Sequence, residues 1–428
     1  MNSKMICAIL AIAFAAGSVF ALHAEVTLDW CRASAARNYP LSRQRGVIDE
    51  NLDLSLSLAT RDRLPRASLS AKATTQSDVT EMSIETPMMK IDTSGDPEQY
   101  QIALEVSQVL WDGGIVAAKK SNARVSAAVD SGKLDVDMSA LSGRVDQLFF
   151  GVLLADAQLG QNRLLREDLV SNCSRVSAMV ENGVASKSDL AAVEVEILKV
   201  EQSAAEIIAT RRSLVGTLSV LTGEMESDAD FAVPAKIVAF ADTIDGRPEF
   251  GLFSAQERLC DAAKEGYLAQ AMPRLSVFAQ AGYGKPALNM LSNEADSFWV
   301  VGARVNWAID SIYTLGVNYG RADTSSKQVR IERDKFVINA ESDAIKYRED
   351  IDKYVKLVEG DDAIIDLRGT IRRAAEVKYE NGTISVNDLL REITAEHLAM
   401  QTKELHEIQL LYSEYSLERA LGNTGEKK

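Results

Sequence analysis

The sequence of 428 residues has few of the side chains that form disulfide frameworks and metal sites. One of its four cysteines, Cys7, lies in the N-terminal apolar segment, and the other three, Cys31, Cys173 and Cys260, are odd in number and far apart. The three histidines are not spaced like zinc ligands. The sequence therefore predicts no disulfide framework, no metal and no other cofactor.

Basic residues are also fewer than acidic residues: there are 47 lysines and arginines and 62 aspartates and glutamates, which gives a formal net charge of −15. Nucleic-acid binding requires a basic stripe that neutralises phosphates, so the composition argues against a nucleic-acid partner. The excess of carboxylates fits either an ordinary solvated surface or a water-filled passage lined with acidic groups. Composition alone does not distinguish these two.

Only one long apolar run is present, and it covers residues 5 to 22. Lys4 precedes it, and the small residues Ala21 and Ala24 lie at its end, which is the arrangement of a secretory signal peptide over residues 1–24. A membrane anchor is the alternative, although the many alanines make the run weakly apolar. No later run reaches the 18 apolar residues of a membrane helix, so any further crossing must use strands.

Prolines, of which there are eight, are absent from residues 98 to 233 and from residues 287 to 428. Since proline interrupts helices, both windows can hold uninterrupted helix. Residues 190 to 221 carry apolar side chains at steps of three and four, a coiled-coil pattern broken once, by Arg211. The apolar side after residue 389 is less regular and is interrupted by His397.

Each window contains one copy of a repeated passage: ENGVASKSDL at 181–190 and ENGTISVNDL at 380–389. About 66 residues separate Gly113 from the first copy, which as helix would extend about 100 Å, and a similar length precedes the second. We expect two long helical hairpins that fold back at the ENG turns. Glycine permits the positive φ of such turns, and Ser186 with Asp189, or Ser385 with Asp388, caps the returning helix.

Alternating patterns of period two precede both long helices. Residues 100 to 107 and 298 to 307 each place apolar residues on one side, and two partner strands begin after Pro65 and Pro273. Polar loops over residues 77–98 and 285–296 are expected to join the strands of each pair. The strands have the length of bilayer-crossing strands, although a half-buried soluble sheet alternates in the same way. Four strands cannot close a barrel, so a membrane sheet must be completed by other copies.

The order helix, strand, strand, helical hairpin, written twice, resembles the TolC family of outer-membrane efflux proteins over essentially the whole mature chain. The local sequences that carry this resemblance are LWDGG at 110–114, AIDS at 308–311, the two ENG passages, LTG at 221–223 and ALG at 420–422. The first repeat spans 25–231, with strands about 65–76 and 100–110 and a hairpin about 113–223. The second spans 232–428, with strands about 273–284 and 298–308 and a hairpin about 311–422.

This resemblance implies a mainly α fold with a β-barrel part, internally duplicated, in which each chain gives four transmembrane strands. It also implies a homotrimer in the outer membrane that extends into the periplasm. The implied function is that of a passive exit duct, not an enzyme, for a tripartite efflux or type I secretion system. Its partners would be outer-membrane lipid, a periplasmic adaptor (membrane fusion) protein and an inner-membrane transporter. The exported substrate is not specified.

The resemblance also implies site residues at the tips. The adaptor would dock on the turns, and Tyr379, Asp388 and Asp189 would contribute to gating and selectivity, although helix capping is the alternative for both aspartates. Two departures are Ile384, where the family has an arginine, and Arg391, where a second aspartate is expected. We therefore expect closure by packing and by Tyr379 hydrogen bonds, with Asp388 as the only acidic ring. The predicted docking residues are Gly183, Val184, Ala185, Gly382, Thr383 and Ile384.

A different class of function is also compatible with the helical pattern. A secreted or periplasmic coiled-coil scaffold or adhesin would expose similar long helices and conduct nothing. A periplasmic adaptor also has helical hairpins, but it normally lacks two strand pairs of bilayer length.

Overall fold

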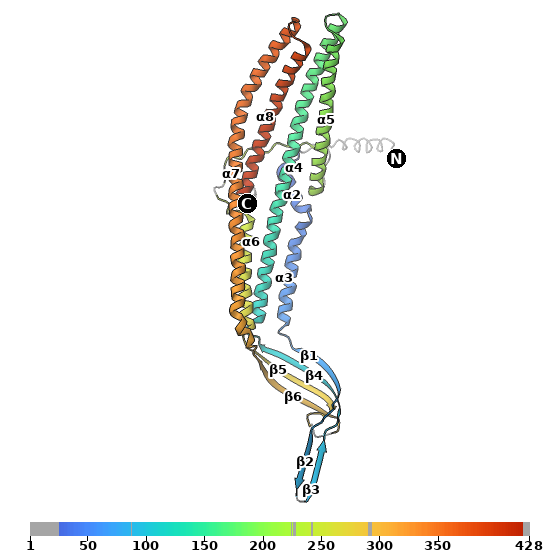
Figure 1. Ribbon diagram of the computed structural model, residues 1–428, viewed down its shortest axis with the longest axis vertical. Helices are drawn as coiled ribbons and strands as arrows, with labels where there is room; N and C mark the ends of the chain where they lie inside the picture. The colour runs from blue at the N-terminus through green and yellow to red at the C-terminus, as the bar shows by residue number, and fades with distance from the viewer. Residues whose placement is uncertain are drawn as a thin grey trace, which may run out of the picture. The chain divides into compact units, whose positions relative to one another are not determined.

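The computed structural model describes residues 25–86, 88–223, 225, 228–240, 243–289 and 293–422. The predicted signal peptide, including Ala21 and Ala24, lies outside the described residues. The fold class is confirmed, because long helices dominate and the strands form a small antiparallel sheet (Figure 1). No helix among the described residues combines the length and the apolar character needed to cross a membrane.

The chain divides into two compact units, each of which takes segments from both sequence repeats. The hairpin unit consists of residues 1–42, 137–247 and 337–428, and the strand unit of residues 43–136 and 248–336. The repeats predicted at 25–231 and 232–428 are therefore not separate compact bodies. Residues of both repeats pack together in the same buried clusters, as Val193 of the first repeat does with Leu390 of the second.

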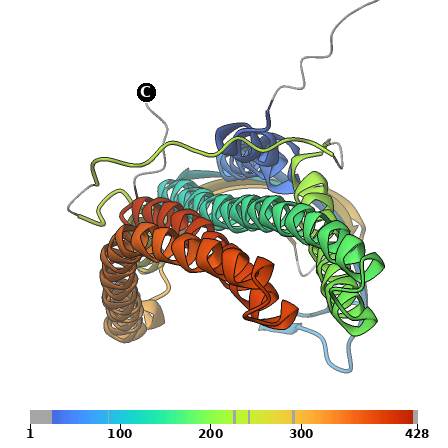
Figure 2. The same cartoon turned by 90° about the horizontal axis from the view of Figure 1, so that it is seen from above.

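The hairpin unit contains the two predicted hairpins and a short N-terminal helix. In each hairpin a helix of about 70 residues, which extends about 100 Å, is followed by a return helix of about half that length. Figure 2 shows α4 and α5 side by side, and likewise α7 and α8. The elements are α2 (Leu28–Asn38), α4 (Ile115–Glu181, in part), α5 (Lys187–Thr222), α7 (Asp310–Glu380, in part) and α8 (Val386–Ala420).

The largest core cluster of this unit joins α2 to α4, α5 and α8. Cys31 of α2 is fully buried in it, and burial raises the pKa of its thiol to about 12, so this cysteine is a packing residue. Asp146 of α4 is buried beside the cluster and accepts hydrogen bonds from Arg32 of α2 (2.7 and 2.9 Å) and from Arg419 of α8 (3.0 Å). A single carboxylate thus joins three helices.

The strand unit contains a four-stranded antiparallel sheet in the order β1-β4-β5-β6. Its two repeats meet at the β4–β5 pair, where Leu104 lies opposite Ala281. The sheet strands are β1 (Arg66–Thr75), β4 (Glu98–Trp111), β5 (Arg274–Lys285) and β6 (Asp296–Asn306). The unit also holds α3 (Gln44–Arg61), which follows a short 3-10 helix over Pro40–Arg43, and α6 (Pro248–Gln270), with the first parts of α4 and α7.

The expectation of a loop over residues 77–98 was wrong. This segment forms an antiparallel hairpin of β2 (Glu81–Thr86) and β3 (Met89–Ser94), in which Glu81 lies opposite Ser94. Backbone pairing along the hairpin satisfies the amides and carbonyls of a segment whose polar composition gave no strand signal.

The register of the four-stranded sheet separates an apolar face from a polar face. The apolar face is open to solvent, with Trp299 74% exposed and Val305 70% exposed. The polar face is more enclosed: Ala103 is buried, and Phe298 is 7% exposed because its ring packs directly over Gly282, a position without a Cβ. The apolar face is formed by Leu69, Ala71, Tyr100, Ile102, Leu104, Val106, Val277, Ala279, Ala281, Tyr283, Trp299, Val301, Ala303 and Val305.

Candidate functional site

The two hairpin tips adopt the same backbone turn. Gly183 and Gly382 have φ values of 73° and 69°, a region that glycine enters without steric cost. After each glycine the chain closes back on the first helix: the Val184 amide donates to the Met179 carbonyl at 2.8 Å, and the Thr383 amide donates to the Lys378 carbonyl at 2.9 Å. These bonds satisfy the last carbonyls of α4 and α7, as in the common glycine-ended helix terminus.

Reciprocal capping boxes start the return helices. The Ser186 hydroxyl accepts from the Asp189 amide at 3.2 Å, and the Asp189 carboxylate accepts from the Ser186 amide at 3.0 Å. Ser385 and Asp388 make the same pair of bonds, both at 3.2 Å. Both aspartates predicted for gating and selectivity therefore cap helices, which is the alternative that the sequence left open.

Asp388 is also charged and accessible. Hydrogen bonds from the Ser385 hydroxyl and amide lower its pKa below the ordinary 3.8, and the positive charge of Arg391 lowers it further. Because the folded-state pKa is depressed, its contribution to stability is complete above the ordinary value and is lost as pH falls below it. Arg391 Nη2 lies 3.5 Å from Asp388 Oδ1, so a cation partly offsets the predicted acidic ring.

Tyr379 is half-buried between the two hairpins. It packs against the buried cluster of Ala375, Leu389 and Ile393, and also against the cluster around Val193 of α5. Burial raises the pKa of its hydroxyl, and the charge of Asp189 raises it further. Within the part of the chain that the structure describes, its hydroxyl makes no hydrogen bond, so packing alone positions this side chain.

The six predicted docking residues differ in accessibility. Gly183, Val184, Gly382 and Thr383 are exposed, whereas Ala185 is half-buried. Ile384 is half-buried too, and it packs against the cluster of Ala375, Leu389 and Ile393. The two tips thus present different surfaces: Val184 points an apolar side chain to solvent at 71% exposure, while Ile384 is turned inward.

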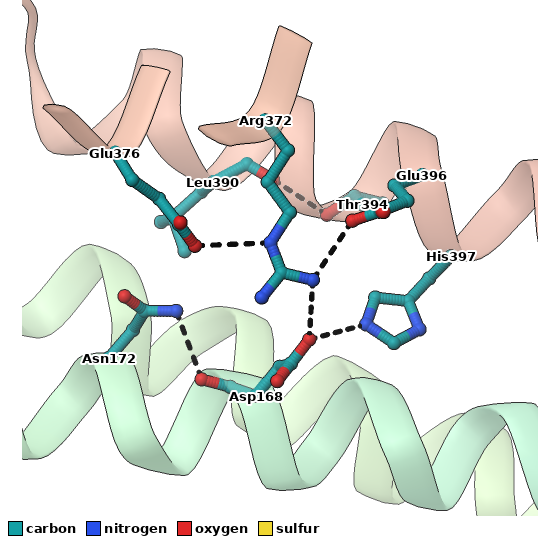
Figure 3. A network of polar contacts seen from close by, with 8 residues as sticks. All are labelled: Asp168, Asn172, Arg372, Glu376, Leu390, Thr394, Glu396 and His397. Atoms are coloured by element: carbon teal, nitrogen blue, oxygen red, sulfur yellow. Dashed lines mark hydrogen bonds and ion pairs between the residues drawn. The ribbon is translucent and has the colours of Figure 1, made fainter. Parts of the chain in front are cut away.

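A polar cluster, which sequence reasoning missed, lies between one and four helical turns back from the tips (Figure 3). Arg372 of α7 is at its centre: Nη1 donates to Asp168 of α4 at 2.8 Å and to Glu396 of α8 at 2.9 Å, while Nε donates to Glu376 at 3.1 Å. A further hydrogen bond of 2.8 Å joins His397 Nε2 to Asp168. We call Asp168, Arg372, Glu376, Glu396 and His397 the Arg372 cluster.

The Arg372 cluster connects the first hairpin to both helices of the second. Glu396 and His397 are buried and Arg372 is mostly so, which strengthens the electrostatic interactions among them. Burial tends to lower the pKa of Arg372, but hydrogen bonds to Glu396 and Glu376 and the charge of Asp168 outweigh it and raise the pKa. The interruption of the apolar stripe at His397 was the one sequence signal of this contact.

The other interruption, at Arg211, has a similar cause. Arg211 Nε donates to Asp156 of α4 at 2.5 Å, and Nη2 donates to the Ala229 carbonyl at 2.8 Å. Both breaks in the coiled-coil pattern are therefore polar contacts between helices. Among the described residues no group of three histidine, cysteine or acidic side chains has a geometry that would hold a metal ion.

Comparison with known proteins rests on structure, because no family model matches the sequence and no curated protein is similar to it. The outer-membrane channel OprN superposes with a TM-score of 0.69 at 16% identity, covering 92% of this chain and 90% of its own. The CmeC outer-membrane channel of Campylobacter jejuni superposes with a TM-score of 0.68 at 14% identity, covering 92% of this chain and 85% of its own. The open-state MtrE outer-membrane channel of Neisseria gonorrhoeae superposes with a TM-score of 0.67 at 15% identity, covering 92% of this chain and 88% of its own.

The chain has the fold of these outer-membrane channels. The resemblance to the TolC family is thus confirmed for the fold, over nearly the whole described chain. In this channel fold the tips and the Arg372 cluster belong to the hairpin unit, and the polar and apolar faces of the sheet belong to the strand unit.

Proposed function

We propose that the protein is a passive exit duct of the outer membrane that extends into the periplasm. In this proposal it carries substrate from an inner-membrane pump, reached through a periplasmic adaptor, in a tripartite efflux or type I secretion system. Transport of this kind makes and breaks no bond, so an enzyme activity has no part in it. The observation that carries the proposal is the sheet with a solvent-open apolar face, whose strands lead into two helical hairpins of about 100 Å.

The apolar face has the height expected of a sheet that crosses a bilayer. Tyr100 and Tyr283 lie near one end of the strands, and Trp111 lies at the other, after a β-bulge that shifts the register between Val109 and Trp111. Trp111 lies eleven positions after Tyr100, which corresponds to about 36 Å along the strand, or about 25 Å across the membrane at a 45° tilt. Aromatic residues at both ends of such a band suit the two interfaces of a membrane.

Further copies of the chain are needed in this proposal. The sheet ends on the edge strands β1 and β6, whose outer edges have no partner strand among the described residues. Lipid does not tolerate open edges, and three copies would join twelve strands into one closed barrel. Isoleucines at heptad spacing on α7, Ile331, Ile338 and Ile345, are each about 60% exposed and would pack against neighbouring copies.

Membrane fractionation distinguishes the duct from the coiled-coil scaffold or adhesin. A duct is expected in the outer-membrane fraction and should run as a trimer in mild detergent that separates into single chains on heating. Recovery of the protein in the soluble wash as a single chain would instead support the scaffold.

Docking of an adaptor at the tips is tested by crosslinking from an exposed turn residue. Val184→Cys and Thr383→Cys leave both capping boxes intact, and the native Cys173 and Cys260 are replaced by serine to remove competing thiols. We expect both variants to capture the same periplasmic protein, whose identity would indicate the class of pump. Capture from a control cysteine at Ser342, an exposed residue of α7, but not from the tips would contradict docking there.

Selectivity at the tips is proposed to depend on Asp388, repeated three times around the axis. Asp388→Asn keeps the capping acceptor but removes the charge, so we expect lower preference for cations and weaker block by multivalent cations in planar bilayers. Asp189→Asn, which changes the equivalent cap of the first hairpin, is the matched control. It should change the cation preference and the block by multivalent cations less than Asp388→Asn does. Equal behaviour of wild type and Asp388→Asn would reject the acidic ring.

A further inference from the structure

The polar face of the sheet carries an unexpected charge. The chain as a whole is strongly acidic, at −15, yet four basic residues and only two acidic residues lie on this face. One of the two acids, Asp296, stands at the end of β6 away from the helices. The basic residues are Arg66, Lys72, Arg274 and Arg304, and the acidic residues are Glu105 and Asp296.

The cross-strand register leaves two of these arginines without an acidic neighbour. Arg304 lies opposite Ser276, and Arg274 lies opposite Asn306, which makes the two arginines diagonal neighbours with Cα atoms about 7–8 Å apart. Glu105 lies opposite Gln280 on the neighbouring strand instead. Neither guanidinium forms a hydrogen bond or ion pair within the described part of the chain, and both side chains are exposed.

An aromatic ring positions one of these guanidiniums. The Arg304 guanidinium lies over the Phe278 ring, 4.8 Å from its centroid. The Phe278 ring in turn packs on Gly302, where a Cβ would come within 3.1 Å of two ring atoms. This contact limits the movement of the guanidinium, and a planar guanidinium with unpaired N–H donors can bind carboxylate, sulfonate or phosphate oxygens in pairs.

We propose that Arg274, Arg304 and Phe278 form an anion-binding site on the polar face, and that the exported substrates include aromatic organic anions. This inference rests on the proposed function, because the polar face lines a passage only in a closed barrel. Three copies would place six unpaired arginines around that passage, and rings of arginine favour anions in pores. The anionic group of the substrate would bind the two arginines, while its aromatic ring lies beside Phe278.

Block of the reconstituted full-length channel by pyrene trisulfonate, an aromatic polyanion, tests this site. When the probe is added on the side of the bilayer where the strands form the mouth of the channel, the current through the wild-type channel is expected to be blocked. Arg274→Gln/Arg304→Gln should raise the blocking concentration about tenfold or more, since charge-assisted hydrogen bonds are lost. Arg304→Gln alone should give a smaller increase, and Arg333→Gln, which changes an arginine of α7 outside the sheet, should give none.

The outcomes separate the inference from the proposed function. A wild-type channel that conducts but is not blocked, or is blocked equally in the double variant, would overturn the anion site and leave the duct standing. A wild-type protein that forms no channel would overturn both. A shift of the reversal potential toward cation preference in the double variant, measured in a potassium chloride gradient, would support the site independently of the probe.

Discussion

Replacing Asp146 with alanine is expected to lower the free energy of unfolding by about 3–5 kcal/mol. The Asp146 side chain is only 2% exposed, and it accepts hydrogen bonds from both Arg32 and Arg419. Its loss leaves two guanidiniums in a largely buried place without this partner and removes the polar link of α2 and α8 to α4. Urea unfolding followed by far-ultraviolet circular dichroism measures the change.

A matched control is Asp135→Ala, which changes another aspartate of α4 and removes its ion pair with Arg45 of α3. Both members of this pair are largely exposed, so its loss should cost less than about 1 kcal/mol. Equal effects of the two substitutions would show that burial does not determine the contribution of these pairs, contrary to the packing described above.

The second large effect is expected from Arg372→Met, which keeps much of the side-chain volume but removes the charge. Asp168, Glu376 and Glu396 then face one another without the cation that binds them, and we expect a loss of about 2–4 kcal/mol, reduced from the fully buried case because Arg372 retains 22% exposure. Faster amide exchange should appear in α8 near His397, because the cluster links this part of α8 to α4. Hydrogen exchange followed by mass spectrometry locates the change.

Arg373→Met provides the comparison for this prediction. Arg373 is the next residue of α7, is exposed, and donates only to the Thr370 hydroxyl at 3.1 Å within the described part of the chain. Its substitution should leave both stability and the exchange of α8 nearly unchanged. If Arg373→Met loosened α8 as much as Arg372→Met does, the specific role of the cluster would be disproved.

Local sequence patterns predicted most of the fold. The absence of proline and the repeated ENG turns indicated the two hairpins, and the predicted ends of the four sheet strands lie within two residues of those observed. These features depend on residues close together in the chain: glycine at the turn, serine and aspartate at the cap, and alternation along a strand.

Features that depend on distant residues were not predictable in this way. Arg372 and Asp168 are 204 positions apart, and His397 and Asp168 are 229 apart, so no local pattern joins them. The sequence showed only that His397 interrupted an apolar stripe. The β2–β3 hairpin was missed for a different reason, because the polar residues of the segment 77–98 suggested a loop.

The tips illustrate both situations. Their capping boxes were predictable from the spacing of Ser385 and Asp388, whereas the inward packing of Ile384 and the ion pair of Arg391 with Asp388 emerge only in three dimensions. The proposed gate therefore combines the packing of Tyr379 and Ile384 with the Arg372 cluster behind them. The second hairpin supplies most of these groups, which supports a larger role for it in closure.

The central claim is that the chain forms a water-filled duct through a membrane. Single-channel recording tests it most directly, with purified full-length protein added to one side of a planar lipid bilayer. A trimeric duct should give stepwise, uniform conductance increments that require the trimeric species and disappear after heating. Folded, trimeric protein that inserts into the bilayer without carrying current would contradict it.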